Sequence, residues 1–270
     1  MTRTRVRPPS RVAGPEATLL TVERGMQVLR AFRCERSAVS NAELVRRTGL
    51  SKATVSRLTS TFIQLGFLRH VAGGREFELG TGPLSIGHSF IEASPLVRMA
   101  NPFLQALADK LNVSVALAIP NGLEMLYICY RTSDRIATLR LGVGSLLPLG
   151  TTSIGRAWLW ALAPAEQKRL ISELKRAAGG RGAALEQSIR ESFAELDANG
   201  TCAVLGGYQR DAYGVATPLR VGRDGTLMGL SCGNAEVAPN VAQARKRIGP
   251  ELKKAAVQLE ALFAETDGLP

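Results

Sequence analysis

Residues 41–65 of this 270-residue chain read NAELVRRTGLSKATVSRLTSTFIQL and predict two short helices joined by a tight turn. The first helix runs from Asn41 to Thr48, and Gly49 follows as a residue that readily takes a left-handed backbone. Ser51 is a suitable cap for the second helix. Apolar residues recur along this second helix at spacings of three and four: Val55, Leu58, Phe62 and Leu65. The pattern is typical of a helix-turn-helix.

The opposite side of the second helix is polar and basic near its N-terminus. A helix that enters the DNA major groove uses small hydrogen-bonding groups for base edges and cations for phosphates at that end. The candidate DNA contacts on this side are Ser51, Lys52, Thr54, Ser56 and Arg57. A polar helix face is also commonly just a solvated surface, so this stretch alone leaves an ordinary helical corner as the alternative.

The flanking segments extend this unit to a winged helix-turn-helix. Residues 66–80, GFLRHVAGGREFELG, predict a β-hairpin that turns at Gly73-Gly74. Arg69 and Arg75 lie beside that turn and are candidate contacts to the DNA backbone or minor groove. Residues 21–32, TVERGMQVLRAF, predict a preceding amphipathic helix. Its expected inward residues are Val22, Met26, Leu29 and Phe32, or Val28.

Positive charge is concentrated in the first 80 residues. They hold 14 Lys and Arg against 6 Asp and Glu, whereas residues 81–270 hold 20 against 17. This distribution suits a polyanion such as double-stranded DNA. A membrane surface would also attract it, but no apolar run reaches spanning length and no signal peptide is visible, so we expect a cytoplasmic protein without a membrane partner. Residues 1–17, rich in Arg and Pro, are expected to form a disordered basic arm.

The reactive residue types form no recognisable metal or catalytic pattern. Cys34, Cys129, Cys202 and Cys232 are far apart in sequence, without the paired spacing of a zinc site. The two histidines are His70 and His88, and the chain has neither a nucleophile-elbow motif nor a P-loop. We therefore expect no metal, no cofactor and no catalytic residue.

The remainder of the chain predicts an α+β domain. Residues 81–98 are expected to form a linker helix, and helix continues to Leu111 with a bend or restart at Pro102. Strands, then helices, then strands follow, which favours a mostly antiparallel sheet covered by helices. The predicted strands are 113–120, 123–130, 136–142, 201–205, 213–221 and 226–233, and the predicted helices are 154–162, 165–178, 185–198 and 241–263.

Several segments combine in a specific order and spacing. They are TVERGMQVLRAF, ELVRRTGLSKATVSRLTSTFIQLGFL and EFELG, followed by LPLGTTSIGRAWLWAL, VATPLR and LMGLSCG. On these segments the chain resembles the IclR family of bacterial transcription regulators from about Leu19 to Leu262. The resemblance implies a winged helix-turn-helix at 18–80, a GAF- or PAS-like effector-binding and oligomerisation domain at 99–270, and a dimer or dimer of dimers that acts as repressor or activator.

The resemblance also implies an effector site around the helix start after Gly150. Unpaired N–H groups at a helix start attract an anion, although an ordinary capped helix has the same sequence pattern. The implied contacts are Thr152, Ser153, Ile154 and Gly155 on the helix, with Leu230 and Cys232 on one face of a facing strand. Cys232 is equally consistent with a small core residue.

The segment VLGGYQRDAYG, residues 204–214, departs from the family pattern, because many members have an acidic stretch and an Arg-Cys pair there. We expect the loop 206–213 to cover the mouth of the pocket, with further contacts from Val204, Leu205, Asp211 and Tyr213. Tyr127 and Tyr130 are weaker candidates. An apolar pocket with N–H donors suits a small organic acid, and we favour an aromatic acid or derivative over a keto acid.

The leading hypothesis is therefore a DNA-binding transcription regulator controlled by a small-molecule effector. The alternatives are an enzyme on the second domain with an accessory nucleic-acid-binding module, and a constitutive architectural DNA binder. One reading head covers too few base pairs to be selective, so paired heads are expected. The candidate subunit contacts are Met26, Val28, Phe90, Ile91, Leu96 and Val97.

Overall fold

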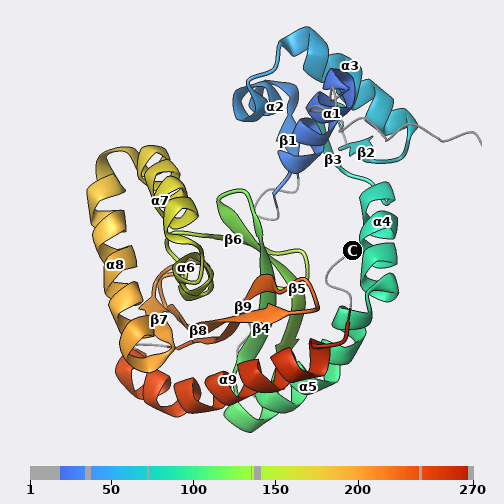
Figure 1. Ribbon diagram of the computed structural model, residues 1–270. Coiled ribbons are helices and arrows are strands. Elements are labelled where there is room, and N and C mark those ends of the chain that lie inside the picture. Colours follow the sequence, from blue (N-terminus) through green and yellow to red (C-terminus); the bar gives the residue numbers. More distant parts are fainter. Residues whose placement is uncertain are drawn as a thin grey trace, which may run out of the picture. The chain divides into compact units, whose positions relative to one another are not determined.

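The computed structural model describes residues 19–33, 38–71, 73–134, 136, 141–236 and 239–266 (Figure 1). The basic arm expected at 1–17 lies outside these residues. The chain divides into two compact units, Met1–His88 and Ser89–Pro270. The helices in the described part of the chain lack the length and apolar character that crossing a bilayer requires.

The first unit is a winged helix-turn-helix. Its helices are α1 (Leu20–Arg30), α2 (Asn41–Thr48) and α3 (Lys52–Gln64). Its strands are β1 (Val39–Ser40), β2 (Leu68–His70) and β3 (Glu76–Leu79), which form an antiparallel sheet of order β1-β3-β2. Gly49 ends α2 with a φ of 68°, and Ser51 caps α3 by accepting from the Thr54 N–H, so the local signals in the sequence are confirmed.

Helix α1 and the residues after it bury Val28 and Phe32 and pack Leu29 against the core, as predicted, but two of the expected inward residues, Val22 and Met26, turn outward. Val28 and Gly25 are buried, whereas Val22 is 58% exposed and Met26 is 44% exposed. A Cβ at Gly25 would lie 3.1 Å from the ring of Phe62. The missing side chain therefore allows α1 to lie directly against α3, while Val22 and Met26 turn outward.

The second unit is built on a six-stranded antiparallel sheet of order β6-β5-β4-β9-β8-β7. The strands are β4 (Ser114–Asn121), β5 (Glu124–Thr132), β6 (Leu146–Pro148), β7 (Cys202–Leu205), β8 (Ala212–Val221) and β9 (Thr226–Ala235). Helices cover both faces (Figure 1). On one face lie α5 (Pro95–Leu111) and α9 (Val241–Phe263), and on the other lie α6 (Ser153–Trp160), α7 (Pro164–Ala178) and α8 (Gly182–Asn199).

Two predicted elements differ from the structure. The helix after the wing breaks at Ser94, which caps α5, and α4 (Gly82–Ala93) precedes it. Pro102 lies inside α5 without ending it. Of the strand predicted at 136–142, residues 137–140 lie outside the described residues, and the strand beside β5 is β6 instead.

Three of the apolar residues expected at a subunit contact lie in the cores of the two units. Val28 belongs to the core of the first unit, and Leu96 and Val97 belong to the core between the sheet and α5. Met26 and Phe90 are exposed. The outward apolar surface is therefore smaller on α5 and larger on α4 than the sequence suggested.

A β-bulge decides which tyrosines share a face. Leu117 pairs with Cys129 and Ala118 pairs with Tyr127, so Ile128 is an extra residue in β5. Tyr127 and Tyr130 consequently face the α6 side together, with ring centroids 6.0 Å apart. Simple alternation would have placed them on opposite faces.

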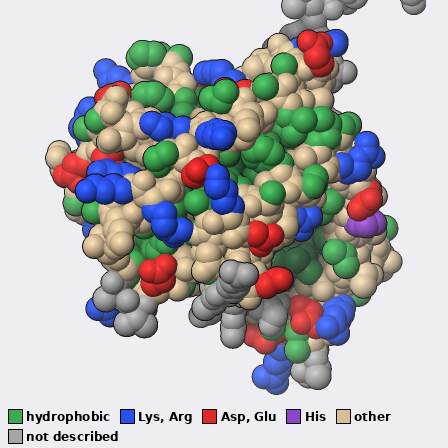
Figure 2. Space-filling view, turned by 90° about the horizontal axis from the view of Figure 1, so that it is seen from below, with side chains coloured by type: hydrophobic (Ala, Val, Ile, Leu, Met, Phe, Trp, Pro, Cys, Tyr) green, Lys and Arg blue, Asp and Glu red, His purple; other side chains and the backbone are tan. Residues whose placement is uncertain are grey.

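The outer face of the second unit around α9 carries charges of both signs. Figure 2 shows Lys and Arg side chains interspersed with Asp and Glu over this region. Two of the cations are paired, Lys110 with Glu251 and Arg245 with Glu195. Mixed charges produce a weak long-range field, so this face offers a poorer surface for DNA than the first unit.

Candidate DNA-binding surface and effector cavity

The predicted DNA contacts on α3 differ in whether their side chains are already engaged in hydrogen bonds within the protein. Lys52 and Arg57 are exposed, and neither head group has a hydrogen bond or ion pair within the described part of the chain. Ser51 is engaged as the cap, and its hydroxyl lies 2.9 Å from that of Thr54. Ser56 accepts a hydrogen bond from Asn41 Nδ2 at 2.9 Å and ties α3 to α2. The two cations are therefore the side chains most available to a nucleic acid.

The two arginines of the wing also differ. Arg69 forms an ion pair with Glu78, its direct partner across β2 and β3, with Nη2 and Oε1 2.5 Å apart. Arg75 is exposed and has no ion-pair partner among the described residues. A phosphate would compete with Glu78 for Arg69, whereas it would meet no such competition at Arg75.

Glu43 holds the helix-turn-helix together through two arginines. Its carboxylate accepts from Arg46 at 2.7 and 2.6 Å and from Arg47 at 2.7 Å, and Arg47 also donates to the Ala31 carbonyl at 2.6 Å. These hydrogen bonds, with that of Arg46 largest, lower the pKa of Glu43 to about 2. The network joins α2 to the end of α1 and so fixes the frame that presents α3.

Replacing Glu43 by Gln is expected to lower the melting temperature of the first unit more at neutral pH than at acid pH. A carboxyl whose pKa is lowered by folding stabilises the folded state above its ordinary pKa of 4.5, and this stability is lost as the pH falls toward about 2. Thermal unfolding of the wild type and the variant at pH 7, 5 and 3 measures the difference. Glu23→Gln, on the exposed side of α1, is the control. A melting-temperature difference that stays constant with pH would contradict this role.

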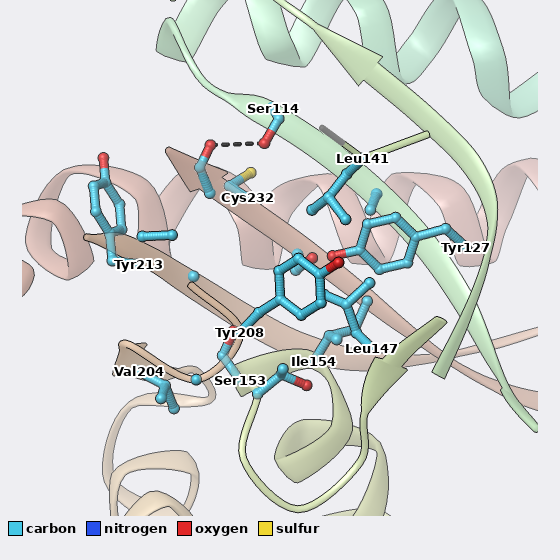
Figure 3. Close-up of a pocket in the computed structure, with 17 residues that line it drawn as sticks. Ser114, Tyr127, Leu141, Leu147, Ser153, Ile154, Val204, Tyr208, Tyr213 and Cys232 are labelled. Carbon is cyan, nitrogen blue, oxygen red and sulfur yellow. Dashed lines mark hydrogen bonds between the residues drawn. The ribbon is translucent and has the colours of Figure 1, made fainter. Parts of the chain in front are cut away.

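A cavity of about 50 Å³ lies in the second unit between the sheet and the start of α6 (Figure 3). Its walls come from β4, β5, β7, β8, β9, the start of α6 and the segment after β7. Hydroxyl groups are frequent in the lining, and they belong to Ser114, Tyr127, Thr152, Ser153, Tyr208, Tyr213 and Ser231. No charged side chain is found among the described lining residues. A bound anion would therefore rely on N–H and O–H donors.

The start of α6 is built by close contacts between backbones. Thr152 caps the helix by accepting from the Gly155 N–H at 3.4 Å, and its hydroxyl donates to the Pro148 carbonyl at 2.7 Å. The Thr151 hydroxyl donates to the Gly207 carbonyl at 2.6 Å. A Cβ at Gly207 would lie 2.2 Å from the Thr151 carbonyl oxygen, so a glycine is needed where the segment after β7 covers the helix start.

Arg156 anchors α6 from inside the core. Its Nε donates to the Gly150 carbonyl at 2.8 Å, and its Nη1 donates to the Ser188 carbonyl and to Ser192 Oγ, both at 2.9 Å. Burial lowers the pKa of Arg156. Because these donors are directed at the turn before α6 and at α8, the guanidinium fixes the helix start and does not line the cavity.

Two tyrosines enclose the interior of the cavity. Tyr127 is buried on β5, and Tyr208 reaches toward it from the segment after β7 (Figure 3). Burial raises the pKa of Tyr127, and a hydrogen bond with Ser231 opposes that shift. Ser114 Oγ donates to the Gly233 carbonyl at 2.8 Å on the same side of the sheet. Tyr127 and Ser231 thus form a polar wall facing the Tyr208 ring.

The structure brings six of the predicted effector contacts to the cavity: Thr152, Ser153, Ile154, Val204, Tyr213 and Cys232. Tyr213 and Cys232 reach only its edge, because their side chains belong to the core on the α5 and α9 side. The Tyr213 hydroxyl donates to Glu236 at 3.2 Å, and Tyr213 points away from the other labelled residues in Figure 3.

Four predicted contacts lie away from the cavity, namely Gly155, Leu205, Asp211 and Leu230. Leu205 and Asp211 are exposed, and Leu230 is fully buried on the other face of the sheet. Leu230 and Cys232 do share a face, but it is Ser231 between them whose side chain faces the cavity. Sequence reasoning missed Ser231 and Ser114, because alternation reveals two faces of a strand without showing which one borders a cavity, and it included Tyr208 and Gly207 only as part of the covering loop.

Gly155→Ala is expected to destabilise the second unit by about 1–3 kcal/mol, the usual cost of overpacking. A Cβ there would lie 2.1 Å from the Leu149 carbonyl oxygen, so backbone would have to move. Denaturant unfolding measures the change. Gly142→Ala is the matched control, because a Cβ at Gly142 meets nothing within 4 Å. Equal stability of the two variants would contradict the prediction, because it would show that the backbone at the start of α6 moves to accommodate the added methyl group without cost.

The first unit is thus a DNA-reading fold and the second a cavity-bearing domain, a combination that defines a ligand-responsive class of DNA-binding protein. Two family models match the chain: the IclR helix-turn-helix domain over residues 21–72 and the bacterial transcriptional regulator IclR C-terminal domain over residues 88–261. The chain belongs to the IclR family and is a DNA-binding transcription regulator of that type.

Relatives match over most of their length. The HTH-type transcriptional regulator TsaQ1/TsaQ2 of Comamonas testosteroni is 27% identical over 244 residues, which cover 89% of this chain and 87% of that protein. An IclR family transcriptional regulator from Brucella abortus aligns with a TM-score of 0.82 and 28% identity, over 92% of this chain and 94% of that one. An IclR homologue from Microbacterium hydrocarbonoxydans, solved with 4-hydroxybenzoate, aligns with a TM-score of 0.64 and 21% identity, over 89% of this chain and 98% of that one.

Proposed function

We propose that a small organic acid binds the cavity at the start of α6 and controls operator binding, and that an aromatic acid or a close derivative is the favoured class. The observation that carries this proposal is an uncharged, hydroxyl-lined cavity at a helix N-terminus, enclosed by Tyr127 and Tyr208. Ser153 and the first N–H groups of α6 would receive the carboxylate. The two rings would contact the rest of the ligand.

The size of the cavity limits the ligand. A volume of about 50 Å³ corresponds to room for only a few water molecules, at roughly 10–15 Å³ of this measure for each. An aromatic ring therefore requires the segment 206–211 to move outward when it binds. The 4-hydroxybenzoate held by the Microbacterium homologue supports the class of ligand.

Calorimetry paired with operator titration tests the proposal. Benzoate, 4-hydroxybenzoate and phenylacetate form the aromatic arm, and acetate, pyruvate and glyoxylate form the aliphatic arm. We expect an aromatic acid to bind and to change operator affinity, because a ligand shifts a regulatory equilibrium only through unequal affinity for its two states. Binding of a keto acid alone would overturn the proposed class of ligand. Binding of an acid without any change in operator affinity would overturn the proposed regulation of operator binding.

An enzyme built on the second unit is the alternative. The described lining offers hydroxyls but no carboxylate, lysine or histidine to act as a base, and both histidines of the sequence precede residue 89. These observations support a sensing role without catalysis. The operator DNA of a bacterium lies in the cytoplasm, where we propose that the protein acts.

We also propose that the protein works as a homodimer or a dimer of dimers. Helix α4 has no buried residue, yet Leu84 is 73% exposed, Ile86 is 60% exposed and Phe90 is 37% exposed. Met26 adds exposed apolar surface on α1. Apolar groups gathered on one helix support an interaction surface.

Leu84→Glu combined with Ile86→Glu is expected to convert the protein to monomers and to weaken operator binding by more than tenfold, because two linked reading heads bind one site together. Light scattering and anisotropy titration measure both effects. The operator is expected to be a pseudo-palindrome with half-sites one helical turn apart or a multiple of it. Leu262→Glu, on the exposed side of α9, is the control. A wild-type monomer at concentrations that saturate the operator would contradict the proposal.

A further inference from the structure

We propose that α1 adds a phosphate-binding groove to the DNA-binding surface, in which Arg24 holds one phosphodiester of the operator backbone beside Arg57. This inference rests on the binding of operator DNA by the first unit and adds a second helix to the contact. The groove has a volume of about 190 Å³ and is lined by Thr21, Arg24, Thr54, Arg57, Leu58 and Thr61. Its ligand class is a phosphate diester.

The groove exists because α1 packs Gly25 closely against α3. Gly25 lies against Phe62, with the built Cβ position only 3.1 Å from the ring and 3.8 Å from Leu58. This contact places the two helices side by side with little space between their axes. Arg24 precedes Gly25 directly, and Thr21 lies one turn earlier on α1. Both residues therefore border the N-terminal half of α3, where the DNA contacts were predicted.

The cations in the groove are free to bind an anion. Arg24 and Arg57 have no hydrogen-bond or ion-pair partner within the part of the chain that the structure describes. Thr61 already donates to the Arg57 carbonyl at 3.0 Å, and the Thr54 hydroxyl is engaged with Ser51, so these two threonines shape the wall. The planar fork of the Arg24 guanidinium suits a phosphate, which accepts two parallel N–H hydrogen bonds from an arginine.

The start of α1 adds to this attraction. Leu19, at the N-cap position, provides no side-chain hydrogen bond to the helix, unlike Ser40 and Ser51 on α2 and α3. Among the described residues, the positive end of the helix dipole therefore has no side-chain cap beside Arg24 and Thr21. Glu23 is the one acidic residue of this first turn, but it is exposed and is not among the residues that line the groove.

The first experiment measures operator affinity at several salt concentrations. Each phosphate contact contributes roughly 0.9 to the slope of log affinity against log salt, so Arg24→Ala should lower that slope by about 0.9 per protomer bound. The ratio of wild-type affinity to Arg24→Ala affinity should fall roughly threefold to fourfold per contact when salt rises from about 50 to about 200 mM. Arg24→Lys should keep most of the slope. Arg176→Ala removes an exposed arginine from α7 and should change nothing.

The second experiment identifies the phosphate. Single uncharged methylphosphonate linkages are moved along the operator, and each is titrated with wild type, Arg24→Ala and Arg57→Ala. We expect one linkage per half-site to weaken binding by the wild type and by Arg57→Ala, but not by Arg24→Ala. The proposed phosphate-binding role would be overturned if Arg24→Ala had the salt slope of the wild type. It would also be overturned if every methylphosphonate linkage weakened Arg24→Ala as much as it weakens the wild type. Failure of the wild type to bind DNA at all would instead overturn the function of the whole unit.

Discussion

Replacing Arg57 by Ala is expected to weaken operator binding by about 1–3 kcal/mol, with a loss of preference at one base position in each half-site. Arg57 is exposed on α3, and the neighbouring Ser51, Thr54 and Ser56 are engaged in hydrogen bonds that build the helix-turn-helix. The guanidinium, like the Lys52 ammonium, is therefore a free donor on the face of α3 that is predicted to enter the major groove. Anisotropy titration against a set of operators with single base changes measures both effects.

Arg75→Ala is the matched comparison, because Arg75 lies on the exposed wing and carries the same charge. A phosphate contact from the wing should weaken every operator variant similarly and lower the salt slope without changing sequence preference. The two variants thus separate base reading from backbone attraction. Wild-type affinity and preference in Arg57→Ala would rule out base reading by this residue.

Ser153→Arg is expected to abolish the response to effector while leaving the operator affinity of the effector-free protein within about twofold of wild type, because the substitution and the predicted DNA contacts belong to separate units. Ser153 is buried at the start of α6, and a Cβ built on Gly214 would lie 2.5 Å from its Oγ, so a guanidinium at this position has space only inside the cavity. The residues predicted to contact DNA belong to the other unit of the chain. Calorimetry with the acid found for the wild type, together with operator titration, measures the separation.

A milder variant distinguishes loss of the effector site from misfolding of the second unit. Gly214→Ala adds one methyl group beside the Ser153 hydroxyl and should weaken effector binding more than it changes the melting temperature. Ser172→Arg places the same bulky cation on the exposed side of α7 and serves as the control. Unchanged effector affinity in both Ser153→Arg and Gly214→Ala would mean that the ligand binds elsewhere in the second unit.

The sequence by itself determined the parts of this protein that depend on local interactions. The α2–Gly49–α3 corner, its caps and its polar face follow from hydrogen bonds and backbone preferences within a few residues of one another. The hairpin of β4 and β5 likewise follows from Asn121 and Gly122, the latter at a φ of 64°. The order of these elements was enough to indicate the family.

Only the tertiary structure decided which faces meet. The two faces of the sheet are both covered by helices and both apolar, so alternation could not show that Ser231, and not Leu230 or Cys232, faces the cavity. The bulge at Ile128 depends on pairing with β4, and it alone places Tyr127 and Tyr130 on the same side.

Glycines account for the remaining differences between the expected and the observed structure. They allow segments that are distant in sequence to approach each other closely. Gly25 sets the face of α1 that meets Phe62, and Gly207 permits the segment after β7 to contact Thr151. A residue without a side chain carries no hydrophobic signal in a sequence pattern. Its effect becomes visible only when the backbone that it allows to approach is in place.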